Sequence, residues 1–284
     1  MKSTTFNKSK KINLIEMKFI NSGSLSLPSE NRATHCDRTC DSAKFPVINA
    51  RLCNTKVKFV VDSGACATFI NQPTYAKIGY PRLIQTNKRI STTSTATEKS
   101  VALLGKFQVI ITNRDVAKMR MTVYVIDEKI NSWCVLSKSV SLKLGLIRLL
   151  PSITNSWNLL NFIRYANHPV ADVRLNNTKV KFVVDSGTTT TLINRSIYAK
   201  IGSPALAKAN SVVIAFMMNE PVPLLGEFEV TLERDNNRVR TIVYVDDDDK
   251  SMCVLSISDS EMLGLLKLHP GLTRECAHVL FDGV

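Results

Sequence analysis

The chain has 284 residues, of which 44% are hydrophobic, 21% are charged and 7% are aromatic. This length is long for one compact domain and comfortable for two, and the composition excludes a disordered, collagen-like or low-complexity protein. The chain carries 37 Lys and Arg residues against 24 Asp and Glu residues, a formal net charge of +13. Taken over the whole chain, this excess favours an acidic partner such as nucleic acid or an anionic membrane surface.

The hydropathy pattern gives no sign of a membrane protein or a secreted one. No apolar run approaches the roughly 20 residues that cross a bilayer, so we expect no membrane partner. Glu16 and Lys18 interrupt the first apolar stretch, which makes residues 1–30 a poor secretory signal. The seven cysteines, an odd number without a pairing rhythm, favour free thiols in a reducing compartment. An intracellular, cytoplasmic location is therefore predicted.

The main feature of the sequence is an internal repeat. Leu52–Gly64 recurs as Leu175–Gly187, with 12 of 13 positions identical at an offset of 123 residues. The similarity continues, with small changes of offset, as far as Leu144–Leu146 and Leu263–Leu265. A period near 120 residues is too long for a solenoid and indicates a duplicated domain.

The repeat divides the chain into five segments. Residues 1–46 are expected to be a basic, disordered leader, and residues 47–147 form the first repeat. Residues 148–168 are a connector whose apolar residues favour packing onto a repeat. Residues 169–266 form the second repeat, and residues 267–284 are a C-terminal extension.

Each repeat is predicted to consist mostly of strands. Strands are expected at Lys56–Val61, Phe107–Ile111, Met121–Ile126, Phe228–Leu232 and Arg240–Val245. In the first of these, Val, Phe and Val alternate with Lys, which predicts one buried and one exposed face.

Short helices are predicted between the strands. Asn71 and Asn194 are expected to cap helices that end at Gly79 and Gly202, and Ser258 is expected to cap another. Strands with a few short helices predict an all-β or mainly β fold.

The repeated segment ends in Asp-Ser-Gly, at Asp62 and again at Asp185. One such tripeptide is an ordinary turn, but two copies at the ends of matching strands are more informative. If the halves pair about a pseudo-twofold axis, the two carboxyl groups meet and share one proton. Such a pair is suited to the activation of a water molecule that attacks an amide.

Both repeats resemble retropepsin-like aspartic proteases, the kind encoded by gypsy-type retrotransposons and retroviruses. The matching motifs are Val60–Ala65 and Val183–Thr188, Leu103–Gly105 and Leu224–Gly226, and Cys134–Ser137 and Cys253–Ser256. The resemblance covers about 200 of the 284 residues. It implies a tandem pair of retropepsin-like acid protease β-barrel domains that form a pseudo-dimer within one chain.

The resemblance also implies the site and the activity. Asp62 and Asp185 would be the catalytic dyad of an aspartic endopeptidase that hydrolyses a polypeptide substrate without a cofactor. The loops that support the dyad would contain Ser63, Gly64, Ala65, Ser186, Gly187 and Thr188. The flaps that cover the substrate would contain Thr93, Ser94, Thr95, Phe216, Met217 and Met218.

Two departures from the family pattern keep an alternative open. Ser137 and Ser256 occupy a position where the family usually has a glycine, and the expected flaps contain few glycines and differ chemically from each other. The alternative is a catalytically inactive, retroelement-derived protein that uses the fold for dimerisation or partner binding. Pairing of the repeats between two chains, in a homodimer, is also open.

Metal sites are not predicted. His35, Cys36 and Cys40 lack the spacing of a zinc knuckle and its fourth ligand. The run Asp246–Asp249 is interpreted as a solvated hairpin.

Two cysteines flank the first Asp-Ser-Gly segment, but neither is predicted to be a nucleophile. Cys53 and Cys66 have no histidine placed as a partner, and the second repeat has Asn176 and Thr189 at these positions. Both cysteines are expected to be small buried residues.

Counting charge by segment changes the inference from the total. The first repeat carries +10 and the leader +4, whereas the second repeat carries −3. A nucleic-acid footprint across the fold is therefore not expected, beyond weak contacts of the basic leader. Halves of opposite charge attract each other, which supports pairing within the chain.

Overall fold

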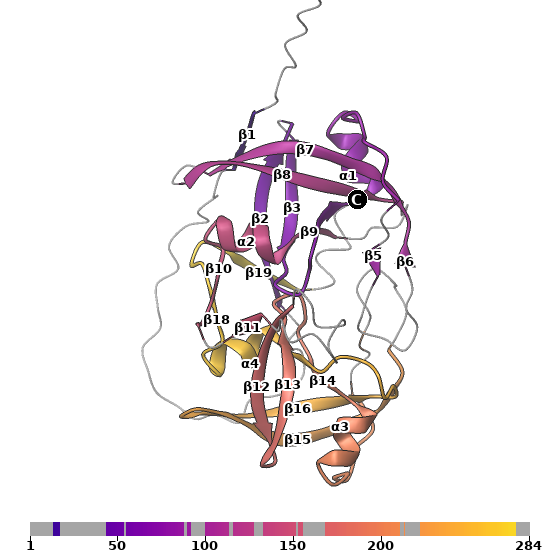
Figure 1. The fold of residues 1–284 in the computed structure, drawn as a ribbon, viewed down its shortest axis with the longest axis vertical. Coiled ribbons are helices and arrows are strands. Elements are labelled where there is room, and N and C mark those ends of the chain that lie inside the picture. The colour runs from indigo at the N-terminus through magenta and orange to yellow at the C-terminus, as the bar shows by residue number, and fades with distance from the viewer. Residues whose placement is uncertain are drawn as a thin grey trace, which may run out of the picture.

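A computed structural model describes residues 14–17, 44–53, 55–87, 90–91, 100–113, 116–127, 133–151, 153–155, 168–210, 213 and 222–276. The chain is mainly β, as predicted, with several sheets and short helices (Figure 1). None of the described helices is long and apolar enough to cross a membrane.

The strands of the first half and its flanking segments are β1 (Leu14–Met17), β2 (Lys44–Leu52), β3 (Thr55–Val61), β4 (Thr68–Ile70), β5 (Ile90–Ser91), β6 (Ser100–Val101), β7 (Leu103–Asn113), β8 (Val116–Ile126), β9 (Cys134–Leu136), β10 (Ile147–Leu149) and β11 (Thr154–Asn155). Those of the second half are β12 (Pro169–Leu175), β13 (Thr178–Val184), β14 (Thr191–Asn194), β15 (Leu224–Arg234), β16 (Asn237–Asp246), β17 (Val254–Leu255), β18 (Leu266–Leu268) and β19 (Thr273–Cys276). The helices are α1 (Gln72–Lys77), α2 (Lys138–Lys143), α3 (Arg195–Lys200) and α4 (Ile257–Met262). The five strands predicted from the sequence all lie within observed strands.

The two halves repeat the same strand pairing. The first sheet has the order β1-β7-β8-β4-β9-β3-β2-β19, and the second has the order β11-β12-β13-β17-β14-β16-β15. In each half the first two strands form an antiparallel hairpin, and the second strand then pairs in parallel with a short late strand, β9 or β17. The registers also agree. Val47 pairs with Val60 in the first half, and the residues 123 positions later, Val170 and Val183, pair with each other in the second half.

Strand β3 shows why this part of the sequence forms a strand. Val57, Phe59 and Val61 are buried, and Lys56 and Lys58 are exposed, as the alternation predicts. Val60 is buried as well, because a second apolar cluster that contains Phe45 covers the other face near the end of the strand. The end of β3 is therefore enclosed on both faces.

The helix caps agree with the sequence at two positions and differ at a third. The side chains of Asn71 and Asn194 cap α1 and α3, as predicted. Helix α4 begins after Ser256 and not after Ser258. Ser256 has an extended backbone, and its hydroxyl accepts the N–H of Asp259 at 3.1 Å, so the cap forms two residues earlier than predicted.

The halves are joined by strands that cross between them. Strand β10 of the first half pairs antiparallel with β18 of the second. The segment after the first half forms β11, which pairs with β12 at the start of the second half. The segment after the second half forms β19, which returns to pair with β2 of the first half (Figure 1). Each half therefore extends the other half's sheet.

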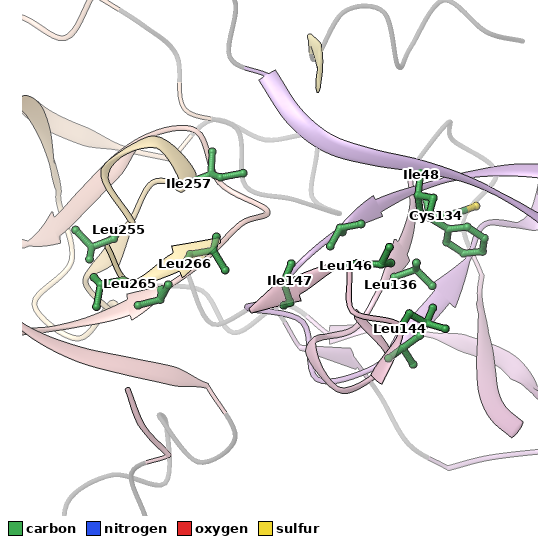
Figure 2. Packing of buried hydrophobic residues seen from close by; sticks show 14 of the residues in the cluster. Ile48, Cys134, Leu136, Leu144, Leu146, Ile147, Leu255, Ile257, Leu265 and Leu266 are labelled. Carbon is green, nitrogen blue, oxygen red and sulfur yellow. The ribbon is translucent and has the colours of Figure 1, made fainter. Parts of the chain in front are cut away.

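The main apolar core contains residues of both halves. Leu136, Leu146 and Ile147 belong to one buried cluster that also includes Leu255, Leu265 and Leu266, their counterparts in the second half. Figure 2 shows these two groups near each other, with Ile147 and Leu266 at the sides that face. Burial of this apolar surface stabilises the association of the halves.

Three strands lie wholly in segments for which no regular structure was predicted, and one of them, β11, lies in the connector and pairs with β12. Strand β1 lies within the leader that was expected to be disordered, and it runs parallel to β7. Strand β19 lies within the C-terminal extension. Strands β1 and β19 find their partners across the tertiary structure, and the local sequence carries no signal of those partners.

Candidate functional site

The two Asp-Ser-Gly segments lie against each other where β3 and β13 end. The N–H of Asp62 donates to the carbonyl of Leu136 at 3.1 Å, and the N–H of Asp185 donates to the carbonyl of Leu255 at 3.4 Å. The equivalent late strand, β9 in the first half and β17 in the second, therefore fixes the aspartate of each half. The two carboxyl groups lie close to each other, although they are 123 residues apart in the sequence.

The glycine of each segment contacts the aspartate of the other half. A Cβ atom added to Gly64 would lie 2.6 Å from Oδ2 of Asp185, and one added to Gly187 would lie 2.6 Å from Cγ of Asp62. Real Cβ atoms do not approach other heavy atoms so closely. Glycine is therefore required at both positions because the carboxylate occupies the space of a side chain.

Backbone N–H groups hold the carboxylates in place. Oδ1 of Asp62 accepts the N–H groups of Gly64 at 2.7 Å and Ala65 at 2.9 Å. Oδ1 of Asp185 accepts the N–H of Gly187 at 2.7 Å. Each carboxylate thus binds its own loop through one oxygen.

The two serines connect the loops reciprocally. The Ser63 hydroxyl donates to the carbonyl of Val184 and accepts the N–H of Ser186, both at 2.8 Å. The Ser186 hydroxyl donates to the carbonyl of Val61 and accepts the N–H of Ser63, both also at 2.8 Å. Both serines are at most 1% exposed. Four buried hydrogen bonds therefore join the halves directly beneath the aspartates.

Burial and the neighbouring carboxyl group shift the protonation of this pair. The pKa of Asp62 lies well above its ordinary value, first because burial disfavours the charged form and second because the negative charge of Asp185 is close. The N–H groups of Gly64 and Ala65 oppose this shift by stabilising the anion. Asp62 therefore keeps its proton to a higher pH than a solvent-exposed aspartate does.

Ser137 and Ser256, which stand where retropepsin-like proteases usually have a glycine, fit their positions without backbone strain. Ser137 has φ of −65° and Ser256 has φ of −59°, so neither needs the left-handed conformation that favours glycine. Their N–H groups donate to the hydroxyls of Thr68 and Thr191, each at 3.0 Å. Neither serine therefore distorts the backbone at the start of α2 or α4.

The sequence did not identify two ionisable residues beside the first loop. His168 lies next to the backbone of Gly64. Burial lowers its pKa, and the charge of Asp185 offsets part of this shift. Lys138 is the first residue of α2, and its N–H donates to the carbonyl of Ala65 at 3.0 Å. The signal that could have found them is the comparison of the repeats, since Phe45 and Ile257 stand at these positions in the other half.

The cysteines are free thiols in the described part of the chain, but one of them is not where we expected it. Cys134 and Cys253 are buried, and burial raises the pKa of Cys253 to about 12. Cys53 is half-buried. Cys66 was expected to be buried and is exposed, because it lies in a bend between β3 and β4 and in neither strand.

The expected flap residues Thr93, Ser94, Thr95, Phe216, Met217 and Met218 lie outside the described residues, as do His35, Cys36 and Cys40. The described bases of the two segments pair in the same way in both halves. Strand β5 pairs with β6, and the N–H of Val222 donates to the carbonyl of Val213 at 2.7 Å.

The acidic run at the end of β16 differs from the solvated hairpin that we predicted. Asp246 is only 2% exposed, and burial raises its pKa to about 6. Asp246 pairs with Leu224 as Ile126 pairs with Leu103, so it occupies the place of a buried isoleucine. Within the described ranges, no group of three or more His, Cys, Asp or Glu residues is arranged to hold a metal ion.

Comparison with known proteins gives a likeness in structure alone. No protein-family model matches the chain, and no curated protein matches it in sequence. Similar solved structures include EIAV protease complexed with the inhibitor HBY-793, with 18% identity and a TM-score of 0.31 over 39% of this chain and 99% of that one. A retropepsin-like aspartic protease from Rickettsia conorii has 16% identity and a TM-score of 0.30 over 40% of this chain and 80% of that one.

A third similar structure is the retroviral protease-like domain of Ddi1 from Leishmania major, with 16% identity and a TM-score of 0.27 over 32% of this chain and 74% of that one. Each of these structures matches less than half of this chain at low identity. The interpretation of the site therefore rests on the geometry of the chain itself.

Proposed function

We propose that this protein is an aspartic-type endopeptidase whose dyad is formed by Asp62 and Asp185 at the interface of its two halves. The observation that carries the proposal is the contact of the two carboxyl groups, each packed against the glycine of the opposite loop. Two carboxyl groups that share one proton supply both a general base and a general acid at one place.

The proposed reaction needs only this pair and a water molecule. The ionised carboxylate accepts a proton from the water while the protonated carboxyl donates a hydrogen bond to the carbonyl oxygen of the substrate amide. Addition of the water oxygen to the carbonyl carbon gives a tetrahedral intermediate. A proton then passes from the pair to the amide nitrogen, the C–N bond breaks, and a carboxylic acid and an amine leave. No cofactor takes part.

Several contacts support pairing of the halves within one chain. The four hydrogen bonds of Ser63 and Ser186 are buried, and strands β11 and β19 each extend the sheet of the opposite half. A salt bridge of 2.6 Å between Lys58 and Glu275 also crosses between them. We propose that the active unit is the monomer, in which both halves shape one site for a polypeptide.

The test is to replace the two aspartates singly. Asp62→Asn and Asp185→Asn should each lower kcat/KM for a peptide library by about 10²–10⁴-fold, because either change removes the shared proton chemistry. Asp127→Asn is the matched control, since Asp127 is exposed at the end of β8. A statine-type inhibitor such as pepstatin should bind the unmodified protein. Full activity of Asp62→Asn would show that the shared-dyad model is wrong.

The same experiment separates the alternatives. A folded protein that cleaves no peptide in the library, with or without the substitutions, would favour the inactive binding protein. Mass measurement at the concentration of the assay distinguishes the monomer from a homodimer. In a homodimer built from equivalent repeats, each aspartate would pair with its own copy in the second chain, so Asp62→Asn would keep the activity of the intact Asp185 pair, whereas in the proposed monomer either substitution removes the dyad.

A further inference from the structure

We propose that the outer end of the first half binds single-stranded nucleic acid. The binding surface comprises Lys56, Lys77, Tyr80, Arg82 and Lys106, and we call it the first-half basic surface. It surrounds the end of α1, and Figure 1 shows α1 and α3 at opposite ends of the long axis of the molecule, so the surface lies away from the second half. Such binding does not depend on the proposed endopeptidase.

An exposed aromatic ring is the centre of this surface. Tyr80 lies three residues after the end of α1 and is 65% exposed. Its ring contacts the ring of Tyr75 edge-on at a centroid distance of 5.2 Å, which fixes its orientation and leaves most of it in solvent. Tyr80 also has φ of +50°, in the left-handed region that bulky residues rarely adopt. An exposed ring on such a backbone contributes little to packing, and this indicates a binding role for it.

Hydrogen bonds hold two of the lysines beside the segment that follows α1. The Thr55 hydroxyl donates to the carbonyl of Lys77 at 3.2 Å, so Lys56 lies next to a residue that contacts the end of the helix. Backbone hydrogen bonds of 2.7 Å and 2.9 Å join Lys106 to Ile84 of that segment. Strands β3 and β7 therefore bring their lysines to the same end of the first half.

The four cations of the surface are not neutralised by acidic residues of the described ranges. Lys56, Lys77 and Arg82 are exposed and Lys106 is half-buried, and none of them forms a salt bridge within the described part of the chain. Like charges gathered on one surface repel one another, and a polyanion that binds there relieves the repulsion.

The second half has the same backbone at this place. The Tyr198 hydroxyl donates to the carbonyl of Pro204 at 2.6 Å, as the Tyr75 hydroxyl donates to the carbonyl of Pro81 at 2.9 Å. The segment after α3 is therefore a structural copy of the segment after α1, and the differences between the two lie in their side chains.

The side chains differ between the halves in polarity and charge. Three residues of the second half that are uncharged or acidic stand at the places of Tyr80, Arg82 and Lys106: Ser203, Ala205 and Glu227. Glu227 exchanges backbone hydrogen bonds of 2.9 Å and 3.0 Å with Ala207, which confirms its place in the repeat. Ser203 has φ of +49°, so this backbone does not need an aromatic side chain. At the end of the helix the lysine is kept, as Lys200.

The second half also neutralises a lysine that the first half leaves charged. Asp172 forms a salt bridge of 3.0 Å with Lys179. Asn49 stands at the place of Asp172 in the first half, so Lys56, the counterpart of Lys179, has no carboxylate there. Compared with its copy, the first half gains cations and an aromatic ring and loses acids at this surface.

Single-stranded nucleic acid matches this combination of groups. Lysine and arginine bind phosphates, and an exposed aromatic ring stacks on a base whose face is open. The bases of a duplex are stacked on one another and present no open face, so the ring favours a single strand. Four neutralised phosphates predict a slope of about −3 for log K against log salt concentration, at about 0.7 for each phosphate of a single strand.

The experiment measures binding of fluorescein-labelled oligo(U) and oligo(dT) of about 12 nucleotides to the full chain by fluorescence anisotropy. Tyr80→Ser, which copies the second half, should weaken binding about 5- to 100-fold, the value of one lost stacking contact. Tyr80→Phe keeps the ring and should bind as the unmodified protein does. Arg82→Ala should lower the magnitude of the salt slope by about 0.7.

A cation of the first half outside the surface provides the matched control. Lys143→Ala, at the exposed end of α2, should change the affinity less than about twofold, because the charge is remote from the surface and screened by salt. The leader is unchanged in every variant, so its own contacts with nucleic acid cancel in the comparison. Peptide cleavage on the same samples should be unchanged by Tyr80→Ser, so failure of the proposed endopeptidase leaves the binding test intact.

The outcomes separate the partners that a basic surface can attract. Equal affinity of Tyr80→Ser and the unmodified protein, or equal affinity for oligo(dT) and its duplex with oligo(dA), overturns the inference, because charge alone would then explain the binding. Binding to vesicles of phosphatidylserine and phosphatidylcholine without binding to either oligonucleotide also overturns it and assigns the surface to a membrane. A difference between oligo(U) and oligo(dT) identifies the preferred nucleic acid as RNA or DNA, and equal affinities assign the binding to groups that both share; either result supports the inference when Tyr80→Ser weakens the binding.

Discussion

Replacement of Ser63 by Ala removes a hydroxyl that makes two hydrogen bonds between the halves. The Ser63 hydroxyl donates to the carbonyl of Val184 and accepts the N–H of Ser186. Both bonds are buried, and Ser63 is only 1% exposed. Each buried group left without a partner costs about 1–3 kcal/mol. The free energy of unfolding should therefore fall by about 2–5 kcal/mol. Ser186→Ala should give a similar loss, because it breaks the equivalent pair of bonds.

The measurement is urea unfolding followed by tryptophan fluorescence, with peptide cleavage measured on the same samples. Ser196→Ala is the matched control, since this exposed hydroxyl makes one bond of 2.9 Å to the carbonyl of Asp249 and its loss should change stability by less than about 0.5 kcal/mol. The double variant of Ser63 and Ser186 should lose less unfolding free energy than the sum of the losses in the single variants. Once the loops separate, water can reach the backbone groups that have lost their hydrogen-bond partners. A loss for Ser63→Ala no larger than that of the control would refute the reasoning.

The other predictions concern buried carboxyls and a crossing strand. Asp246→Asn should raise the free energy of unfolding above pH 6, because the ionised carboxylate destabilises the folded state there. A folded pKa of about 6 against the ordinary 3.8 corresponds to at most about 3 kcal/mol, which screening at the strand end reduces to about 1–2 kcal/mol. An equal effect at pH 4 would contradict this prediction. Asp62→Asn should make the free energy of unfolding less dependent on pH, because the raised pKa makes the stability of the unmodified protein fall as pH rises from the ordinary value of 3.8 through the folded value. Equal slopes of unfolding free energy against pH in the variant and the unmodified protein would contradict the shared proton. Deletion of residues 273–284 should lower stability by roughly 2–4 kcal/mol, at about 1 kcal/mol for each net backbone bond of β19, whereas deletion of residues 277–284 leaves that strand intact and should not.

Local chemistry made several parts of the fold predictable from the sequence. Alternating Val and Lys residues indicated β3 because a strand with one face in a core needs this period, and Asn71 and Asn194 indicated helix starts because an amide side chain satisfies free N–H groups. The place of the third cap was wrong because Ser256 and Ser258 carry the same signal. The extended backbone that leaves β17 selects Ser256.

Other features of the site could not be predicted from local chemistry. Cys66 was expected to be buried and is exposed, and Asp246 was expected in a solvated hairpin and is buried in the place of an isoleucine. Burial at these positions depends on which elements from distant parts of the chain cover them. The roles given to the flap residues stay predictions.

The sequence by itself determined that the chain is written twice, that it is mainly β, and that each copy carries one aspartate in a tight turn, because these follow from residue identity and short-range geometry. Only the tertiary structure decided that β11 and β19 extend the opposite halves and that each glycine lies against the other half's carboxylate. Such contacts join residues more than 100 positions apart. They depend on the association of the two halves, which the burial of a common apolar core drives and which no local pattern records.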